Sequence, residues 1–107
     1  MSLKLSAAMG FAAKAGKLIS GDFAVSKAVK GRKAKLVILD SAASDATKKK
    51  WHNACDFHRV KLIETDSPGE KLGKADNKVF AVIDEGFGKL ICDAYGAENN
   101  RNDSTQN

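Results

Sequence analysis

The sequence predicts an α/β/α sandwich, in which helices cover both faces of a central mixed sheet of about four strands. Two continuous apolar runs of strand length, 36–39 and 79–83, predict central strands that are buried on both faces. Segments with helical spacing of apolar residues alternate with these runs along the chain, as in folds that pack helices on a sheet. The length of 107 residues suits one domain with one core.

The first third of the chain predicts two helices on either side of a short strand. Residues 2–14 carry small and apolar side chains at helical spacing, and Gly16 is the expected stop of that helix. Residues 18–19 mark the short strand. The second helix covers residues 22–30, and Gly31 is its expected C-cap.

The middle of the chain predicts two more helices with a strand between them. Ser44 is the expected N-cap of a helix that runs to about His58. Residues 61–64 form a short predicted strand. The Ser-Pro pair at 67–68 then opens a helix through Leu72, because proline is favoured in the first helical turn.

The end of the chain predicts an amphipathic helix and a tail. Apolar side chains from Phe87 to Tyr95 follow the i, i+3, i+4, i+7, i+8 pattern, and Gly96 is expected to end the helix. Residues 97–107 are polar and have nothing to bury, so we expect a disordered polar tail. The predicted α/β/α domain therefore covers residues 1–96.

Positive charge gathers in the first part of the chain. The net charge is +5, with 13 Lys and Arg against 4 Asp and Glu in residues 1–62, and 5 against 9 in residues 63–107. This asymmetry favours the binding of a polyanion to one face of the protein. The alternative is a soluble basic protein whose charge serves no such binding. No apolar run reaches the ~20 residues of a membrane helix, so we expect a cytoplasmic protein without a membrane partner.

Cysteine and histidine usage favours neither a metal nor a cofactor. Cys55 and Cys92 lie far apart in the sequence, and we expect two free, mostly buried thiols, with a disulfide as the less favoured alternative. His52, Cys55 and His58 share one predicted helix. The two histidines are separated by ~9 Å of helical rise, so one zinc ion cannot reach all three side chains. We therefore expect no bound metal and no cofactor.

The helix over residues 22–30 carries the pattern that says most about function. The arc opposite its apolar side holds polar residues and one aromatic: Asp22, Phe23, Ser26, Lys27 and Lys30. An RNA-binding helix uses such a mixture, because unstacked bases pack on aromatic faces while ammonium groups hold phosphates. Gly21 lets another backbone approach, and the free N–H groups of the first turn attract an anion. The alternative is an ordinary capped helix with solvated lysines and Phe23 folded back as a hydrophobic staple.

Two carboxylates raise the alternative of an enzyme. Asp40 and Asp84 each follow a predicted central strand, and the ends of parallel strands are a place where an α/β enzyme holds Mg²⁺. The other interpretation is turn formation by Asp40 and helix capping by Asp84. Because the sequence has no nucleotide-binding loop, nucleophile elbow or Cys–His nucleophile motif, we expect a non-enzymatic protein and keep a magnesium-dependent enzyme as a minor alternative.

A series of motifs keeps a fixed order along the chain. Gly-x-x-x-x-Ser-Lys-Ala-Val at 21–29 is followed by Ala-Lys-Leu-Val-Ile at 34–38, and Leu-Gly-Lys-Ala at 72–75 precedes the last strand. Over roughly residues 3–95, this order and spacing resemble those of the kink-turn-binding ribosomal protein superfamily of L-seven-Ae and L-thirty-e. The opening Ala-Gly-Lys-Leu-x-x-Gly at 15–21 makes the chain most similar to small bacterial members of that family.

The resemblance implies an α/β/α sandwich that binds RNA carrying a kink-turn or a similar bulge. In the family, the contacts come from the first turn of the second helix and from the loop before the last strand. Carried over to this chain, these positions are Gly21, Asp22, Phe23, Ser26 and Lys27, with Lys30 on the same face, and Asp76, Asn77, Lys78, Val79 and Phe80 in the loop.

The chain departs from the family pattern where bases are recognised. Phe23-Ala24 stands in place of the Asn-Glu that reads sheared G·A pairs. Gly31 replaces a usual basic residue, with Arg32 displaced by one, and the second loop is short after Ala75. Because Phe-Ala cannot offer the same hydrogen bonds to guanine edges, we expect weak binding of a standard kink-turn.

These observations together predict a non-enzymatic, monomeric RNA-binding protein that is associated with the ribosome and binds rRNA or another structured RNA. Phe23 would stack on a base, and a set of basic side chains would hold phosphates: Lys27, Lys30, Arg32 and Lys33. The alternative from another class is a protein-interaction module that docks on a ribosomal or assembly factor, because lysines also bind acidic protein surfaces.

Overall fold

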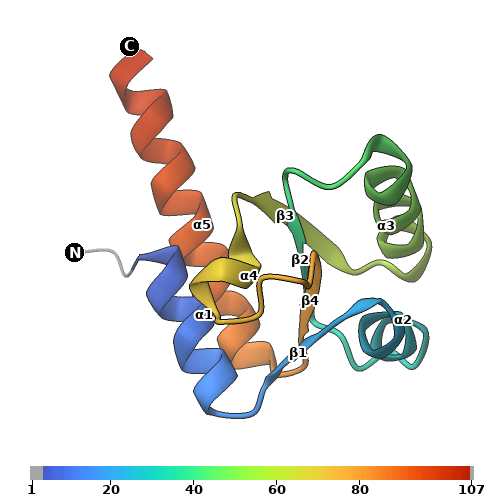
Figure 1. Ribbon diagram of the computed structural model, residues 1–107. Helices are drawn as coiled ribbons and strands as arrows, with labels where there is room; N and C mark the ends of the chain where they lie inside the picture. Colours follow the sequence, from blue (N-terminus) through green and yellow to red (C-terminus); the bar gives the residue numbers. More distant parts are fainter. Residues whose placement is uncertain (1–3, 107) are drawn as a thin grey trace.

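In the computed structural model, which describes residues 4–106, helices and strands alternate along the chain as the apolar pattern predicts (Figure 1). The elements are α1 (Leu5–Lys14), β1 (Leu18–Ser20), α2 (Asp22–Lys30), β2 (Leu36–Asp40), α3 (Asp45–His58), β3 (Lys61–Thr65), α4 (Pro68–Lys71), β4 (Val79–Val82) and α5 (Glu85–Gln106). For α2, the predicted and observed bounds are the same.

The strands form a mixed sheet with the order β1-β4-β2-β3. β4 is antiparallel to both of its neighbours, β1 and β2, whereas β2 and β3 are parallel. In the middle of the sheet, Ile38 pairs with Phe80 on one side and with Ile63 on the other. The predicted central mixed sheet of about four strands is therefore confirmed.

Helices cover both faces of this sheet, which explains the two continuous apolar runs. Figure 1 shows α1, α4 and α5 on one side of the sheet and α2 and α3 on the other. In β2, Leu36 and Ile38 pack into the core under α1 and α5, while Val37 and Leu39 pack under α2 and α3. A strand that alternates between two covered faces has no polar face, so it is apolar at every position.

The ends of α2 and α3 show where local sequence determines the chain path. Ser44 caps α3 as predicted, because its Oγ accepts a hydrogen bond from the backbone N–H of Thr47 at 3.2 Å. Gly31 is the C-cap of α2 as predicted, but its φ is −84°. The left-handed residue is the next one, Arg32, with φ 60°, and Arg59 after α3 has φ 59°.

The last helix differs from its predicted end. α5 does not stop at Gly96 but continues to Gln106, through residues for which the sequence predicts a disordered tail. A single glycine costs a helix only about 1 kcal/mol, and Ala97 and Glu98 continue it. The Glu98 carboxylate also accepts a hydrogen bond from the backbone N–H of Leu5 at 2.9 Å, so α5 fills an open N–H position at the start of α1. Beyond residue 98 the structure describes the backbone alone, up to residue 106, and residue 107 lies outside the described residues.

Among the described residues, no helix combines the length and the apolar character that crossing a membrane requires. Both cysteines are free: Cys55 on α3 is buried, and Cys92 on α5 is half-buried. Burial, helped by the neighbouring charge of Asp56, raises the pKa of the Cys55 thiol to about 11. Burial also raises the pKa of Cys92. Both thiols therefore stay protonated near neutral pH.

Candidate nucleic-acid interface

The structure brings the start of α2 and the loop before β4 into direct contact. The backbone N–H of Gly21 donates a hydrogen bond to the carbonyl oxygen of Val79 at 3.0 Å. Gly21 has φ +96°, a conformation that favours glycine, and a Cβ added there would lie 3.8 Å from Asn77 Oδ1. We call this place the helix–loop junction and define it by Gly21, Asp22, Asn77, Lys78 and Val79. The two stretches from which the family resemblance implies RNA contacts meet here.

A hollow of about 320 Å³ opens at the helix–loop junction. Its lining includes Trp51 of α3 together with the five junction residues. The Trp51 side chain is 1% exposed, and its indole N–H has no hydrogen-bond partner among the described residues. A buried donor without a partner loses its hydration without compensation. One of the residues that line the hollow therefore carries a buried indole N–H without a partner in the described part of the chain.

The loop between α4 and β4 is held by close backbone packing. Gly69 of α4 is buried, and a Cβ at this position would collide with the carbonyl oxygen of Lys74 and lie 2.8 Å from that of Asn77. The backbone N–H of Lys74 donates to the Gly69 carbonyl oxygen at 2.6 Å. Only glycine permits this approach, so Gly69 shapes the loop that carries Asn77 and Lys78 to the junction.

Buried charge fixes the end of the same loop. The Asp40 side chain is buried at the end of β2, and its Oδ2 lies 3.6 Å from the Lys78 ammonium nitrogen. The backbone N–H of Asp40 also donates to the Lys78 carbonyl oxygen at 2.8 Å. The Lys78 side chain is still 54% exposed, so it is anchored near the hollow and remains open to solvent.

Phe23 does not fold back as a hydrophobic staple. Its side chain is 83% exposed on the first turn of α2, which contradicts the alternative of an inward-packed ring. A groove of about 520 Å³ runs beside it, with Ile19, Ala24 and Ile83 among its apolar walls and Lys27 and Lys33 among its charged ones. Water meets this ring on almost all sides, as a stacking surface for a base requires.

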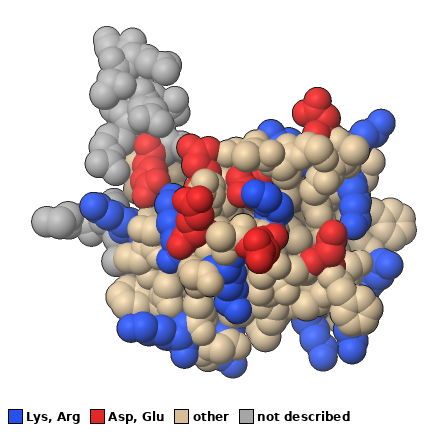
Figure 2. Space-filling view, in the orientation of Figure 1, with Lys and Arg blue, Asp and Glu red and all other residues tan. Residues whose placement is uncertain are grey.

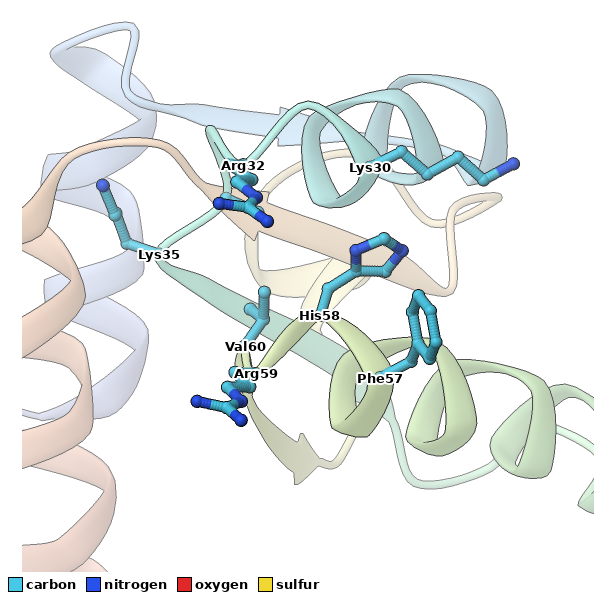
Figure 3. A pocket seen from close by; sticks show the side chains of 8 residues that line it. Lys30, Arg32, Lys35, Phe57, His58, Arg59 and Val60 are labelled. Atoms are coloured by element: carbon cyan, nitrogen blue, oxygen red, sulfur yellow. The ribbon is translucent and has the colours of Figure 1, made fainter.

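The predicted site residues fall into three neighbouring groups. The first group is the helix–loop junction. The second lies along the groove and contains Phe23, Lys27 and Lys33. The third is at the far end of α2, where Lys30 and Arg32 line a separate hollow (Figure 3). Ser26 is half-buried, between these groups.

Two candidates from the loop have buried side chains. Val79 is 3% exposed and Phe80 is 0% exposed, and both belong to β4 and the core. Val79 contributes its carbonyl oxygen to the junction, where it accepts from Gly21. The loop residues that present side chains outward are therefore Asp76, Asn77 and Lys78, of which Asn77 is half-buried.

The acid at the start of α2 has a basic partner on α3. Asp22 Oδ1 lies 3.0 Å from the Lys50 ammonium nitrogen, and that nitrogen lies 4.9 Å from the centroid of the Trp51 ring. Sequence patterns did not single out Lys50 or Trp51, because α3 becomes a neighbour of α2 only through the fold. The sole signal was that α3 carries an aromatic next to a run of lysines.

Charges of both signs appear on the face drawn in Figure 2. Acidic side chains gather across its upper and central part, where some lysines and arginines lie among them, and other lysines and arginines lie toward the lower and right margins. The division into a basic and an acidic part of the sequence is therefore not a simple division of this face. For Lys27, Lys30, Arg32 and Lys33, no ion pair occurs within the part of the chain whose side chains are described.

The structure does not support the alternative of a magnesium enzyme. β2 and β4 are antiparallel, so Asp40 and Asp84, at the C-terminal ends of these strands, lie at opposite edges of the sheet. One ion can be shared only by carboxylates that lie side by side. Asp40 accepts from the backbone N–H of Ala42 at 2.9 Å in a turn, and Asp84 accepts from that of Phe87 at 2.9 Å at the start of α5. Turn formation and helix capping, the other interpretation of these residues, are confirmed.

The three potential zinc ligands on α3 also point to different surroundings. His52 Nε2 lies 2.6 Å from Glu64 Oε2, Cys55 is in the core, and the His58 ring meets the Phe57 ring edge-on. The hydrogen bond from His52, with help from Lys48, lowers the pKa of Glu64 below its ordinary value. Within the described residues, no three His, Cys, Asp or Glu side chains are grouped as a metal site.

Comparison with known proteins identifies relatives over most of the chain. The model of the ribosomal protein L7Ae/L30e/S12e/Gadd45 family matches residues 4–89. A protein named RNA-binding protein YlxQ from Bacillus subtilis (strain 168) is 38% identical over 87 residues, which is 78% of this chain and 87% of the relative. A protein of the same name from Enterococcus faecium is 37% identical over 84 residues, 76% of this chain and 81% of the relative.

Solved structures show the same fold. A protein with unknown function from Bacillus halodurans C superposes with a TM-score of 0.79 at 32% identity, covering 85% of this chain and 95% of the other. The Giardia lamblia 15.5kD RNA binding protein superposes with a TM-score of 0.67 at 21% identity, covering 87% and 82%. At that lower identity, the second likeness concerns the fold alone.

Proposed function

We propose that this chain, which belongs to the ribosomal protein L7Ae/L30e/S12e/Gadd45 family, is a non-enzymatic RNA-binding protein that holds a structured, kink-turn-like RNA at the helix–loop junction. Two relatives that are 37–38% identical carry the name RNA-binding protein, which supports the proposal. The observation that carries it is the junction itself, because a glycine-opened helix start, an outward-facing loop and Trp51, whose indole N–H has no partner among the described residues, line one hollow.

The chemistry of this place suits a nucleic-acid backbone and an unpaired base. The N-terminal turn of α2 presents free N–H groups, which attract phosphate oxygens. Lys78 at the junction and Lys27 and Lys33 along the groove beside Phe23 are exposed and supply positive charge. The exposed ring of Phe23 offers a face on which a splayed base stacks.

Base recognition at this site differs from that of standard kink-turn binders. Phe23 and Ala24, which stand in place of Asn-Glu, supply no amide or carboxylate for guanine edges. Trp51 of α3 lines the same hollow, and its buried indole N–H has no hydrogen-bond partner among the described residues. We therefore propose weak binding of a standard kink-turn and tighter binding of a related bulged RNA, with rRNA on the ribosome in the cytoplasm as the setting and the protein acting as a monomer.

The proposal is tested by titrating the protein into a fluorescently labelled kink-turn RNA duplex at several salt concentrations. We expect binding that weakens steeply with salt, and a slope that falls by about one unit in Lys27→Gln, because one phosphate contact is lost. Lys49→Gln is the matched control, since Lys49 is exposed on α3 and lines none of the three hollows. Binding that does not change with salt, or equal slopes for the two variants, would contradict the proposal.

A further inference from the structure

A second hollow lies at the opposite end of α2 from the helix–loop junction. It has a volume of about 760 Å³ and opens between the C-terminal ends of α2 and α3 (Figure 3). Ala34 and Val60 line it together with six larger side chains: Lys30, Arg32, Lys35, Phe57, His58 and Arg59. We call these eight residues the basic hollow.

The charge of the basic hollow is uncompensated. Lys30, Arg32, Lys35 and Arg59 are all exposed, and no acidic residue is among the lining residues. None of the four forms an ion pair within residues 4–98, whose side chains the structure describes. Four neighbouring cations repel one another, and a concave wall concentrates their field, so the site attracts a ligand with several negative charges.

Both arginines occupy backbone positions that favour glycine. Arg32 has φ 60° and Arg59 has φ 59°, and each is the residue that turns the chain away from its helix. The left-handed conformation brings Cβ close to the backbone, a steric cost that glycine does not have. The neighbouring Gly31 has an ordinary negative φ, so the left-handed position after α2 is occupied by Arg32 and not by the glycine. Both arginines therefore stand at positions where glycine would carry no steric cost, which makes their side chains candidates for a binding role.

An exposed aromatic ring borders these cations. The Phe57 side chain is 82% exposed, and its ring centroid lies 4.9 Å from that of His58 in an edge-on arrangement. Figure 3 shows the two rings beside each other on the α3 side, with Lys30 extending above them from α2 and Arg32 and Arg59 on the other side of the hollow. A guanidinium group can donate two parallel hydrogen bonds to the oxygens of one phosphate, and an exposed aromatic ring can stack on an unpaired base.

We propose that the basic hollow is a second RNA contact, which binds the phosphates and one stacked base of a single-stranded segment flanking the structured RNA at the helix–loop junction. The exposed face of α2 connects the two places, with Lys27 between them and about 13 Å of helical rise from Gly21 to Lys30. A single strand is favoured because a paired base has no free face for Phe57. That the ligand is RNA rests on the proposed function, whereas the location of the second contact rests on the residues of the basic hollow.

The test compares two RNA probes in fluorescence anisotropy: a blunt kink-turn duplex, and the same duplex with a ten-nucleotide oligouridine extension, placed in turn on each free end. We expect one extended probe to bind the protein at least tenfold more tightly than the blunt probe. Arg32→Gly combined with Arg59→Gly should remove this gain and lower the salt slope by about 1.4, at ~0.7 per contact with a single strand. Because glycine suits both backbone positions, this variant is expected to fold.

Further variants separate stacking from charge. Phe57→Ala should lose at least fivefold in affinity for the extended probe and keep its affinity for the blunt probe within twofold. Lys49→Gln, the control on α3, should keep the full gain from the extension. If the extension gives no gain, or if the arginine double variant keeps it, the second contact is refuted. If a twelve-residue polyglutamate peptide displaces the extension as well as a twelve-nucleotide oligouridine does, an acidic protein segment is the better ligand and the RNA proposal is wrong.

The two proposals fail in different ways. Weak, salt-dependent binding of the blunt probe with no gain from the extension would leave the proposed function in place and remove the second contact. Binding of free twelve-nucleotide oligouridine that needs Arg32 and Arg59, without any binding of the blunt probe, would support the second contact and contradict the helix–loop junction as the primary site.

Discussion

The N–H of Gly21 and the carbonyl oxygen of Val79 are joined by a hydrogen bond of 3.0 Å, which links the start of α2 to the first residue of β4. This bond extends the antiparallel pairing of β1 with β4 by one step beyond Ser20, which pairs with Phe80. The helix start and the loop before β4 therefore keep a fixed relative position, and a ligand meets a preformed surface with little ordering cost.

Phe23 should matter for RNA and not for folding. Because its side chain is 83% exposed, Phe23→Ala should change the free energy of unfolding by less than about 0.5 kcal/mol. RNA affinity should fall by about 1–3 kcal/mol if a base stacks on the ring. Anisotropy titration and urea unfolding measure the two quantities.

Replacing Phe23-Ala24 by the Asn-Glu of the family should raise affinity for a standard kink-turn RNA. No gain would contradict our explanation of why this chain differs from the family at positions 23 and 24.

Trp51→Phe should separate the indole N–H from the ring. The substitution removes a buried donor that has no partner among the described residues, which offsets much of the packing lost with the smaller ring. We expect the free energy of unfolding to stay within about 1 kcal/mol of the parent, while RNA affinity falls several-fold. Unchanged affinity in a folded variant would show that the N–H does not contact RNA. Trp51→Ala should instead cost about 3–5 kcal/mol of stability.

Gly69→Ala should disturb the loop before β4. A Cβ at this position collides with the Lys74 carbonyl oxygen and lies 2.8 Å from that of Asn77, so the loop must move or strain must remain. We expect a loss of about 1–3 kcal/mol in stability and weaker RNA binding. Gly73→Ala is an informative comparison, because Gly73 has open space around its Cβ position and only its φ of +72° opposes the change. Equal effects of the two substitutions on RNA affinity would argue against the packing explanation.

The Cys55 thiol should be unreactive until the protein unfolds. Burial raises its pKa to about 11 from an ordinary 9.0, so the folded protein holds this proton more tightly than the unfolded chain. The associated stability is complete below pH 9.0 and is lost as the pH rises toward 11. Timed reaction with a thiol reagent at pH 8 should modify half-buried Cys92 first. Rapid modification of Cys55 in the folded protein would contradict the structure.

Patterns with a clear period predicted most of the fold. The bounds of α2, the Ser44 cap and the buried strands β2 and β4 follow from apolar spacing and local hydrogen bonding. The end of α5 was not predictable from Gly96, because the contact between Glu98 and Leu5 joins residues 93 positions apart. Local sequence carries no signal for such a contact.

The candidate site was predictable only in part. The segments at Gly21 and Asn77 were identified because a known family uses them, and the structure places them together. Trp51, Lys50 and Arg59 were missed because α3 reaches α2 only in the folded sheet, on the shared face covered by both helices. The left-handed conformation of Arg32 was also hidden, since the neighbouring Gly31 was the expected turn residue.

The most direct test of the account is to map the RNA-contacting surface by amide chemical-shift changes in the labelled protein as the blunt kink-turn duplex is added. We predict that the largest changes occur at Gly21, Phe23, Asn77 and Lys78 and at the Trp51 indole N–H, while α1 and the first half of α5 on the other face of the sheet stay unchanged. Changes confined to α1 and α5, with none at Gly21 or at the Trp51 indole, would contradict the central claim that RNA binds at the helix–loop junction.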